Sequence, residues 1–275
     1  MAKESRRTGR GRGQQSPSQG PSRAPPASLQ DLPSSVVSQA TGRRKTLGRW
    51  MEPPARPRYC PQGFELLISL DQLLIYRDIE SMVVISDYED VNTYSVVNKF
   101  GQKIYRAVED SKPWTRQLHG SRRAFRVSVV NRFGFEVMHI QRPYGCDCCW
   151  PYFSNRIEVT ASQNIRVGSI MQDWSCCRRN FAVRDVNGET VLRIRGPWYG
   201  YRTGKFEIMS PDGCRPVGKI SKYWSVNCKD VESGGDILGV TFPRNLNVRL
   251  KAVILGACFL VDLVYFEPRI SCCKR

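Results

Sequence analysis

The chain has 275 residues, of which 41% are apolar and 24% are charged; this globular composition excludes a wholly disordered protein. No apolar run approaches the roughly 18 uninterrupted residues that a spanning helix requires, which excludes a polytopic membrane protein. The formal net charge of +17 favours anionic partners, either phospholipid headgroups or nucleic acid.

Residues 1–58 differ in composition from the rest of the chain. Ser, Pro, Gly and basic residues dominate, and hydrophobic periodicity is absent. Such a segment cannot bury enough apolar surface to fold, so we predict a disordered basic tail. Residues 1–30 also lack the apolar centre of a secretory signal, so we interpret the eleven cysteines as those of a reducing compartment. The thiols are then free, metal-bound or acylated.

From residue 59 onward the chain becomes β-prone. Residues 64–76 predict a helix followed by a strand. Hairpin patterns, each with Asn or Asp at the turn, then cover residues 94–105, 127–138, 181–194 and 206–220, and more weakly 156–170. Gly and Asn tolerate the positive φ that tight hairpin turns require. Four or five hairpins predict an antiparallel sheet of roughly ten or more strands, which closes to remove its exposed edges.

Residues 252–266 break the β pattern with ten apolar residues, Asp262 and four further apolar residues. The ten are Ala252, Val253, Ile254, Leu255, Gly256, Ala257, Cys258, Phe259, Leu260 and Val261. As a helix the segment reaches about 22 Å, short of the roughly 30 Å hydrocarbon core, and Asp262 is costly at that depth. A helix that is apolar on all sides is expected where protein surrounds it. We therefore predict a core helix inside the barrel, with membrane insertion as the alternative.

Several segments of the chain resemble the phospholipid scramblase family. They are LDQLLI (70–75), NKFGQKIY (98–105), AVED (107–110), QRP (141–143), VGKISKYW (217–224) and KAVILGACFLVD (251–262). The resemblance covers residues 59–267 and implies a fold similar to the tubby-like barrel. The expected fold is mainly β, a closed antiparallel barrel of about twelve strands around a central hydrophobic C-terminal helix. The disordered tail, 1–58, precedes it, and a short basic tail with cysteines, 268–275, follows.

The resemblance implies a phospholipid scramblase, with ATP-independent, bidirectional movement of phospholipids between leaflets and Ca²⁺ as the implied cofactor. Conventional catalysis has no support in the residues, because the sequence holds no nucleophile elbow, Walker loop or HExxH motif. The resemblance places the chain on the cytoplasmic face of a membrane, the plasma membrane above all, with a nuclear pool. The expected partners are an anionic phospholipid membrane and importin-type carriers.

Two further functions remain open. The first is a non-scrambling, membrane-tethered adaptor that binds lipid and shuttles to the nucleus. The second is direct DNA binding, which explains the charge but lacks a recognisable reading element, so nucleic acid is not an expected partner.

Cys146, Cys148 and Cys149 stand beside a Trp, a Tyr and a Phe. Acyl chains on such thiols contribute about 0.8 kcal/mol for each buried methylene, and aromatic neighbours suit a membrane interface. Family members are palmitoylated at a similar but longer cysteine run, so we predict an acylation site and a lipoprotein. Plain loop cysteines are the first alternative. A zinc site is the second, and it needs further ligands from Cys176, Cys177, His119 or His139.

The family's calcium segment corresponds to residues 234–245. The resemblance implies acidic residues at both ends, where this chain has Gly234 and Asn245, and Arg244 adds an adverse charge. Asp236 is the remaining clear carboxylate. Because calcium needs several oxygen ligands, we expect Asp236 and Asn245 to form a weak site at best.

A segment after the fourth hairpin resembles the family's non-classical nuclear import signal. It consists of Gly218, Lys219, Ile220, Ser221, Lys222, Tyr223 and Trp224. The same residues predict a β-strand, with Lys219 and Lys222 on opposite faces by alternation.

Overall fold

The computed structural model describes residues 48–78, 92–110, 124–143, 156–198, 204–223 and 237–266. Several predicted features lie outside these residues. They are the acylation site at Cys146, Cys148 and Cys149, the carboxylate of Asp236, the ring of Trp224 and the tail 268–275.

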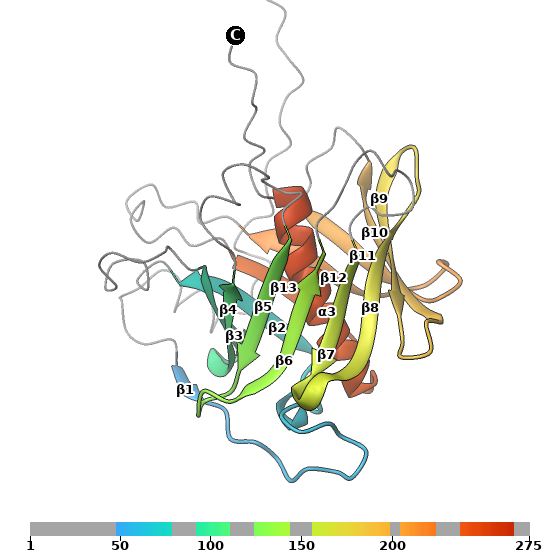
Figure 1. The fold of residues 1–275 in the computed structure, drawn as a ribbon. Coiled ribbons are helices and arrows are strands. Elements are labelled where there is room, and N and C mark those ends of the chain that lie inside the picture. Colours follow the sequence, from blue (N-terminus) through green and yellow to red (C-terminus); the bar gives the residue numbers. More distant parts are fainter. Residues whose placement is uncertain are drawn as a thin grey trace, which may run out of the picture.

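Within the described residues, twelve antiparallel strands form a closed barrel (Figure 1). Their order around it is β4 (Gln102–Asp110), β3 (Thr93–Asn98), β2 (Gln72–Asp78), β13 (Ile237–Thr241), β12 (Pro216–Tyr223), β11 (Lys205–Met209), β10 (Thr190–Trp198), β9 (Arg178–Arg184), β8 (Ile165–Asp173), β7 (Arg156–Ala161), β6 (Glu136–Arg142) and β5 (Phe125–Val130). The barrel closes where β5 pairs with β4, from Arg106 opposite Val130 to Asp110 opposite Arg126. The predicted fold class is confirmed.

All the predicted hairpins form, because their turns carry residues that accept a left-handed backbone. Positive φ angles occur at Gly101, Gly134, Gly188 and Gly213 in four of the turns. The weaker hairpin turns through the short 3-10 segment η6 (Ser162–Asn164), where Gln163 and Asn164 take φ values of 63° and 60°.

The barrel has two different ends. The tight turns of the five hairpins lie at one end, which we name the turn end, together with the segment between residues 50 and 71 and the entry to the central helix. The opposite end, which we name the loop end, carries the last residues of that helix and the connection 174–177 between β8 and β9. Figure 1 shows the turn end at the bottom and the helix rising from it.

The central helix α3 (Val248–Val261) and the π-helical turn η7 (Asp262–Phe266) fill the barrel. The side-chain oxygen of Asn247 accepts from the N–H of Arg249 at 2.9 Å, so the helix starts before the predicted apolar run. Every residue from Lys251 to Val261 is buried, because the sheet surrounds the helix on all sides. The predicted core placement is therefore confirmed. None of the helices formed by the described residues has the length and apolarity to span a bilayer.

Two glycines bring the helix close to the sheet. A Cβ atom on Gly256 would lie 2.9 Å from Cγ2 of Val159 in β7. One on Gly168 in β8 would lie 2.8 Å from Cγ2 of Val253. The helix therefore packs on β7 and β8 at a distance that larger residues at these two positions do not permit.

The end of the predicted tail joins the barrel. Strand β1 (Gly48–Trp50) pairs in parallel with Gln102 and Lys103 of β4, and the N–H of Met51 donates to the Lys103 carbonyl at 2.8 Å. The β4–β5 pairing starts only at Arg106, so β1 covers the part of β4 that β5 leaves open. Residues 48–58 therefore do not belong to a disordered tail. The helix predicted in 64–76 is a single 3-10 turn, η2 (Glu65–Leu67), followed by β2 as expected.

Candidate functional site

Side chains fill the barrel interior from end to end. Near the loop end, Phe206 and Tyr265 meet edge to face with ring centroids 5.0 Å apart, and Tyr265 meets Phe266 in the same way at 4.9 Å. Near the turn end, the side chains of Phe64 and Leu67 are fully buried. A barrel filled in this way offers no wide aqueous path along its axis. A ligand of this barrel therefore has to bind at its outer surface or at one of its ends.

The first turn of α3 contains a fully buried lysine, Lys251. Its ammonium lies 2.7–3.0 Å from four backbone carbonyl oxygens, those of Leu67, Ile68, Leu70 and Arg244, and shares its three N–H groups among them. Burial lowers the pKa of Lys251 to about 8, while the nearby Asp71 acts in the opposite direction. The ammonium joins three segments of the turn end, namely η2 with the residues after it, the loop before α3, and α3 itself.

The ammonium of Lys251 contacts the end of the predicted calcium segment, residues 234–245. The carbonyl of Arg244 already accepts from Lys251 at 2.8 Å, and the neighbouring Asn245 is exposed at the turn end. Over the described ranges, no three His, Cys, Asp or Glu side chains form a group that could hold a metal ion. The oxygens available here lie beside two cations, whereas calcium takes about six to eight oxygen ligands. The described donor set therefore does not fit a calcium ion.

The predicted import segment is strand β12. Lys219 is exposed, whereas Lys222 points inward and is 4% exposed, as the predicted alternation requires. The ammonium of Lys222 lies 2.9 Å from Oδ1 of Asp262 at the end of α3 and 4.9 Å from the ring centroid of Phe266. A carrier that meets the folded barrel can therefore reach Lys219 but not Lys222.

The described candidates for a zinc site do not come together. Cys176 and Cys177 lie at the loop end with their sulfurs 3.0 Å apart. His139 lies within β6, where its Nε2 is 2.8 Å from Oγ1 of Thr160. His119 falls outside the described residues. Pro143 and Arg156 flank the connection that carries the predicted acylation site, so this connection leaves and re-enters the barrel at the loop end.

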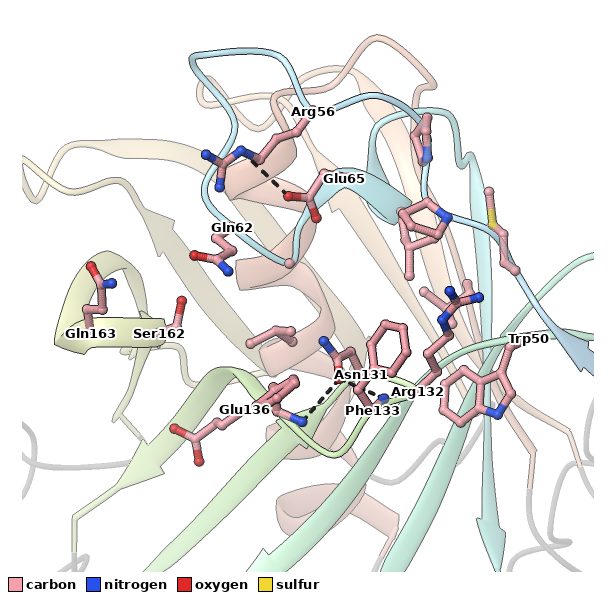
Figure 2. A pocket seen from close by; sticks show the side chains of 18 residues that line it. Trp50, Arg56, Gln62, Glu65, Asn131, Arg132, Phe133, Glu136, Ser162 and Gln163 are labelled. Carbon is pink, nitrogen blue, oxygen red and sulfur yellow. Dashed lines mark hydrogen bonds and ion pairs between the residues drawn. The ribbon is translucent and has the colours of Figure 1, made fainter.

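A pocket of about 540 Å³ opens at the turn end. One wall is the segment from Trp50 to Leu66, and the opposite wall is the β5–β6 hairpin (Figure 2). Trp50, Leu66, Ile104 and Val137 provide apolar surface.

The charged part of the lining consists of two arginines, Arg56 and Arg132, and two carboxylates, Glu65 and Glu136. Arg56 pairs with Glu65 at 4.0 Å, and Figure 2 shows this pair on the arching loop above the pocket. Apolar walls with a few polar groups and this volume are typical of small-molecule sites. We name this site the turn-end pocket.

Sequence patterns did not predict the turn-end pocket or the role of Lys251. The pocket uses residues 50–56, which the composition placed in the tail, so no local pattern marked them. The sequence did carry a signal for Lys251, because this lysine directly precedes an apolar run that is predicted to be buried. A lysine that is buried with such a helix almost always has hydrogen-bond or charge partners. That signal identifies a buried cation but not its four carbonyl acceptors.

Comparison with known proteins decides the family. The scramblase family model matches residues 51–268. The chain belongs to the scramblase family. Phospholipid scramblase 2 from Bos taurus is 40% identical over 222 residues, which cover 79% of this chain and 76% of the bovine protein. Human phospholipid scramblase 2 is 38% identical over 247 residues, which cover 88% and 82% of the two chains.

A third scramblase relative is longer than this chain. Phospholipid scramblase 1 from Rattus norvegicus is 38% identical over 222 residues, which cover 79% of this chain and 66% of the rat protein. A protein of Arabidopsis thaliana solved by X-ray diffraction aligns over 74% of this chain and 99% of its own, with 10% identity and a TM-score of 0.39. That score is too low to support an argument. The resemblance of this chain to the scramblase family is confirmed by the sequence relatives.

Proposed function

We propose that this protein moves phospholipids between the two leaflets of a bilayer, in both directions and without ATP. The membership of the scramblase family and the names of its relatives support this function. The structural observation that carries the proposal is an amphipathic pocket on the outside of a barrel whose interior is filled. A phospholipid combines a phosphate, and in many lipids a cationic headgroup, with apolar chains; these match Arg132, the carboxylate of Glu136 and the apolar walls of the turn-end pocket.

The activity that we propose is transport rather than covalent catalysis. The barrier is the transfer of a charged headgroup through hydrocarbon, and arginines beside an apolar surface lower that barrier by replacing part of the headgroup's hydration. No bond of the lipid has to break.

We propose that Asn245 does not hold an activating calcium ion. The ammonium of Lys251 on the neighbouring carbonyl and the guanidinium of Arg244 both repel a divalent cation. Calcium that stimulates the protein would then act through residues elsewhere in the chain.

We further propose attachment to the cytoplasmic face of the plasma membrane through acyl chains on Cys146, Cys148 and Cys149. Two or more chains hold a protein on a bilayer where a single chain barely does. The nuclear pool would depend on importin-type carriers reading β12, and the exposure of Lys219 makes it the accessible lysine there.

The test is a lipid-scrambling assay with purified protein in liposomes, with and without calcium. Gln62→Trp places a large ring in the turn-end pocket, whereas Gln141→Trp makes the same change at an exposed position of β6. We expect Gln62→Trp to slow scrambling by roughly tenfold and Gln141→Trp to leave the rate near that of the wild type. Asn245→Ala should leave any calcium response unchanged.

Two outcomes would overturn these proposals. Equal rates for the two tryptophan variants would remove the pocket from the lipid path. An inactive wild type that is folded and membrane-bound would favour the alternative function, a membrane-tethered adaptor that binds lipid but does not scramble it.

A further inference from the structure

Two neighbouring turns at the turn end share a sequence and a geometry. They read Asn-Lys-Phe-Gly at 98–101 and Asn-Arg-Phe-Gly at 131–134. The side-chain oxygen of Asn98 accepts from the N–H groups of Phe100 and Gln102 at 2.9 and 3.0 Å. The side chain of Asn131 does the same for Phe133 and Phe135 at 2.9 and 3.1 Å. These hydrogen bonds order both turns.

The ordered turns hold three phenylalanines in solvent. Phe100, Phe133 and Phe135 are 63%, 65% and 70% exposed. Strands β4 and β5 pair from Arg106 onward, so the turns that precede β4 and follow β5 lie at the same end of the barrel, with β1 against the part of β4 next to the first turn. We name residues 98–101 and 131–135 the twin tips. Exposed apolar rings held by ordered turns at one end of a molecule are typical of a surface that meets an apolar partner.

A basic group accompanies the ring on each tip. The Lys99 ammonium lies 5.5 Å from the ring centroid of Phe100 and 3.0 Å from Oδ2 of Asp71, and the Arg132 guanidinium carbon lies 4.5 Å from the ring centroid of Phe133. Aromatic rings settle at the headgroup level of a bilayer, and lysine or arginine beside them reaches the phosphates. Each tip therefore presents an exposed ring with a basic side chain beside it, and a phosphate would compete with Asp71 for the lysine.

The surrounding charge favours a lipid surface over an apolar protein surface. Among the described residues of the turn end, the exposed arginines number seven and the exposed carboxylates number four. Anionic headgroups complement this excess of positive charge. The arginines are Arg49, Arg56, Arg58, Arg132, Arg166, Arg215 and Arg244, and the carboxylates are Glu52, Glu136, Glu189 and Asp212.

We propose that the twin tips insert into the headgroup region of an anionic phospholipid bilayer, so that the barrel docks with its turn end on the membrane. Phe133 and Phe135 also line the turn-end pocket, so this docking brings the mouth of the pocket to the lipid surface. The inference rests on the proposed function only in taking a phospholipid membrane as the partner. It assigns the docking to residues of the fold, independently of any acyl chain.

The test measures co-sedimentation of the full chain, produced without acyl chains, with phosphatidylcholine vesicles that contain or lack phosphatidylserine. The tip variant combines Phe100→Ser, Phe133→Ser and Phe135→Ser, which replace exposed rings and leave both asparagines in place. The matched control combines Trp174→Ser and Trp198→Ser, which remove two exposed rings from the loop end.

We expect the tip variant to lose at least about tenfold in affinity for the phosphatidylserine vesicles, and the loop-end control to bind like the wild type. Unchanged thermal unfolding of both variants establishes that they are folded. Wild-type binding by the tip variant, or loss of binding in the loop-end control alone, would overturn the inference.

A second measurement reads insertion directly. Phe133→Trp adds an indole at one tip, and brominated phospholipids should quench its additional emission on vesicle binding. Bound protein whose added indole escapes quenching would show that a different surface docks. Wild-type protein that docks on vesicles through the tips but does not scramble lipid would overturn the proposed function alone. A tip variant that scrambles at the wild-type rate would overturn this inference alone.

Discussion

Lys251 shows how one residue can organise a whole end of the barrel. Its buried ammonium serves carbonyls of the segment 67–70 and of Arg244, which are about 180 and 7 residues away along the chain. Without the ammonium the carbonyls of Ile68, Leu70 and Arg244 would lose this donor, whereas that of Leu67 would still accept from the N–H of Leu70. An unsatisfied buried polar group costs about 1–3 kcal/mol, so the N–H groups of Lys251 contribute to stability as donors, whereas the desolvation of its charge opposes folding.

We therefore predict that Lys251→Met lowers the free energy of unfolding by about 2–4 kcal/mol, because it keeps the chain length and removes the donor. Urea unfolding followed by circular dichroism measures the change. Lys219→Met, at an exposed site on β12, is the control and should alter stability by less than about 0.5 kcal/mol. Equal midpoints for the two variants would contradict the structural role of Lys251.

The same lysine predicts a pH dependence. The pKa of Lys251 is about 8 in the folded protein, and the ordinary value for lysine, which applies to the unfolded chain, is 10.5. Between pH 8 and pH 10.5 the unfolded chain therefore holds a proton that the folded chain has released. Stability rises with pH wherever the unfolded state binds more protons. The stability of the wild type relative to Lys251→Met should therefore increase from pH 8 to pH 10.5. A flat difference over this window would contradict the lowered pKa.

At the scale of elements, the fold depends on the fit between α3 and the strands around it. The helix is apolar on every face, and Gly256 and Gly168 let its backbone approach β7 and β8. A helix of this kind has no polar face to present to water, so it is stable only inside the completed sheet.

Leu260 tests this placement, because its side chain is completely buried near the loop end of α3. We predict that Leu260→Arg abolishes cooperative thermal unfolding, since an unpaired buried charge costs several kcal/mol against a typical total stability of about 5–15 kcal/mol. Leu250→Arg is the matched control, because Leu250 is only half-buried in the first turn and an arginine there can extend to solvent. A folded Leu260→Arg variant would refute the core position of the helix.

At the scale of the whole molecule, the two ends of the barrel carry different structural features. The turn end carries the pocket and the twin tips, and the predicted acylation site belongs to a connection that starts from the loop end. Both ends of that connection are held at the loop end, and Cys149 is six residues from Pro143, so its thiol can lie at most about 20 Å from the barrel. The nine residues of β4 rise about 30 Å, so acyl chains and twin tips can engage one bilayer only if the barrel axis is tilted toward its surface.

Replacement of Cys146, Cys148 and Cys149 by Ala should therefore release most of the protein from cell membranes, because the acyl chains supply the stronger attachment. Membrane fractionation and metabolic acyl labelling measure this effect. Cys176→Ala with Cys177→Ala is the control, and it should change neither readout. A wild type without acyl label, together with unchanged fractionation of the triple variant, would contradict the acylation site.

Local chemistry explains how much of this protein could be predicted from the sequence. The hairpins could be predicted because their turns need a positive φ at only one or two residues, and Gly, Asn or Asp at those positions accepts it. The apolar run 252–261 likewise specifies a surrounded helix through its own composition. The barrel class and the family resemblance followed from these segments.

The tertiary structure alone decided the features that join distant segments. The addition of β1 to β4, the four carbonyls around Lys251 and the pairing of Lys222 with Asp262 each connect residues that no short pattern links. The pocket arises in the same way, where residues 50–66 meet the β5–β6 hairpin. Turn and helix preferences arise from interactions between residues that are close in the sequence. The contacts between distant segments form only after the barrel has closed and brought its turns to one end.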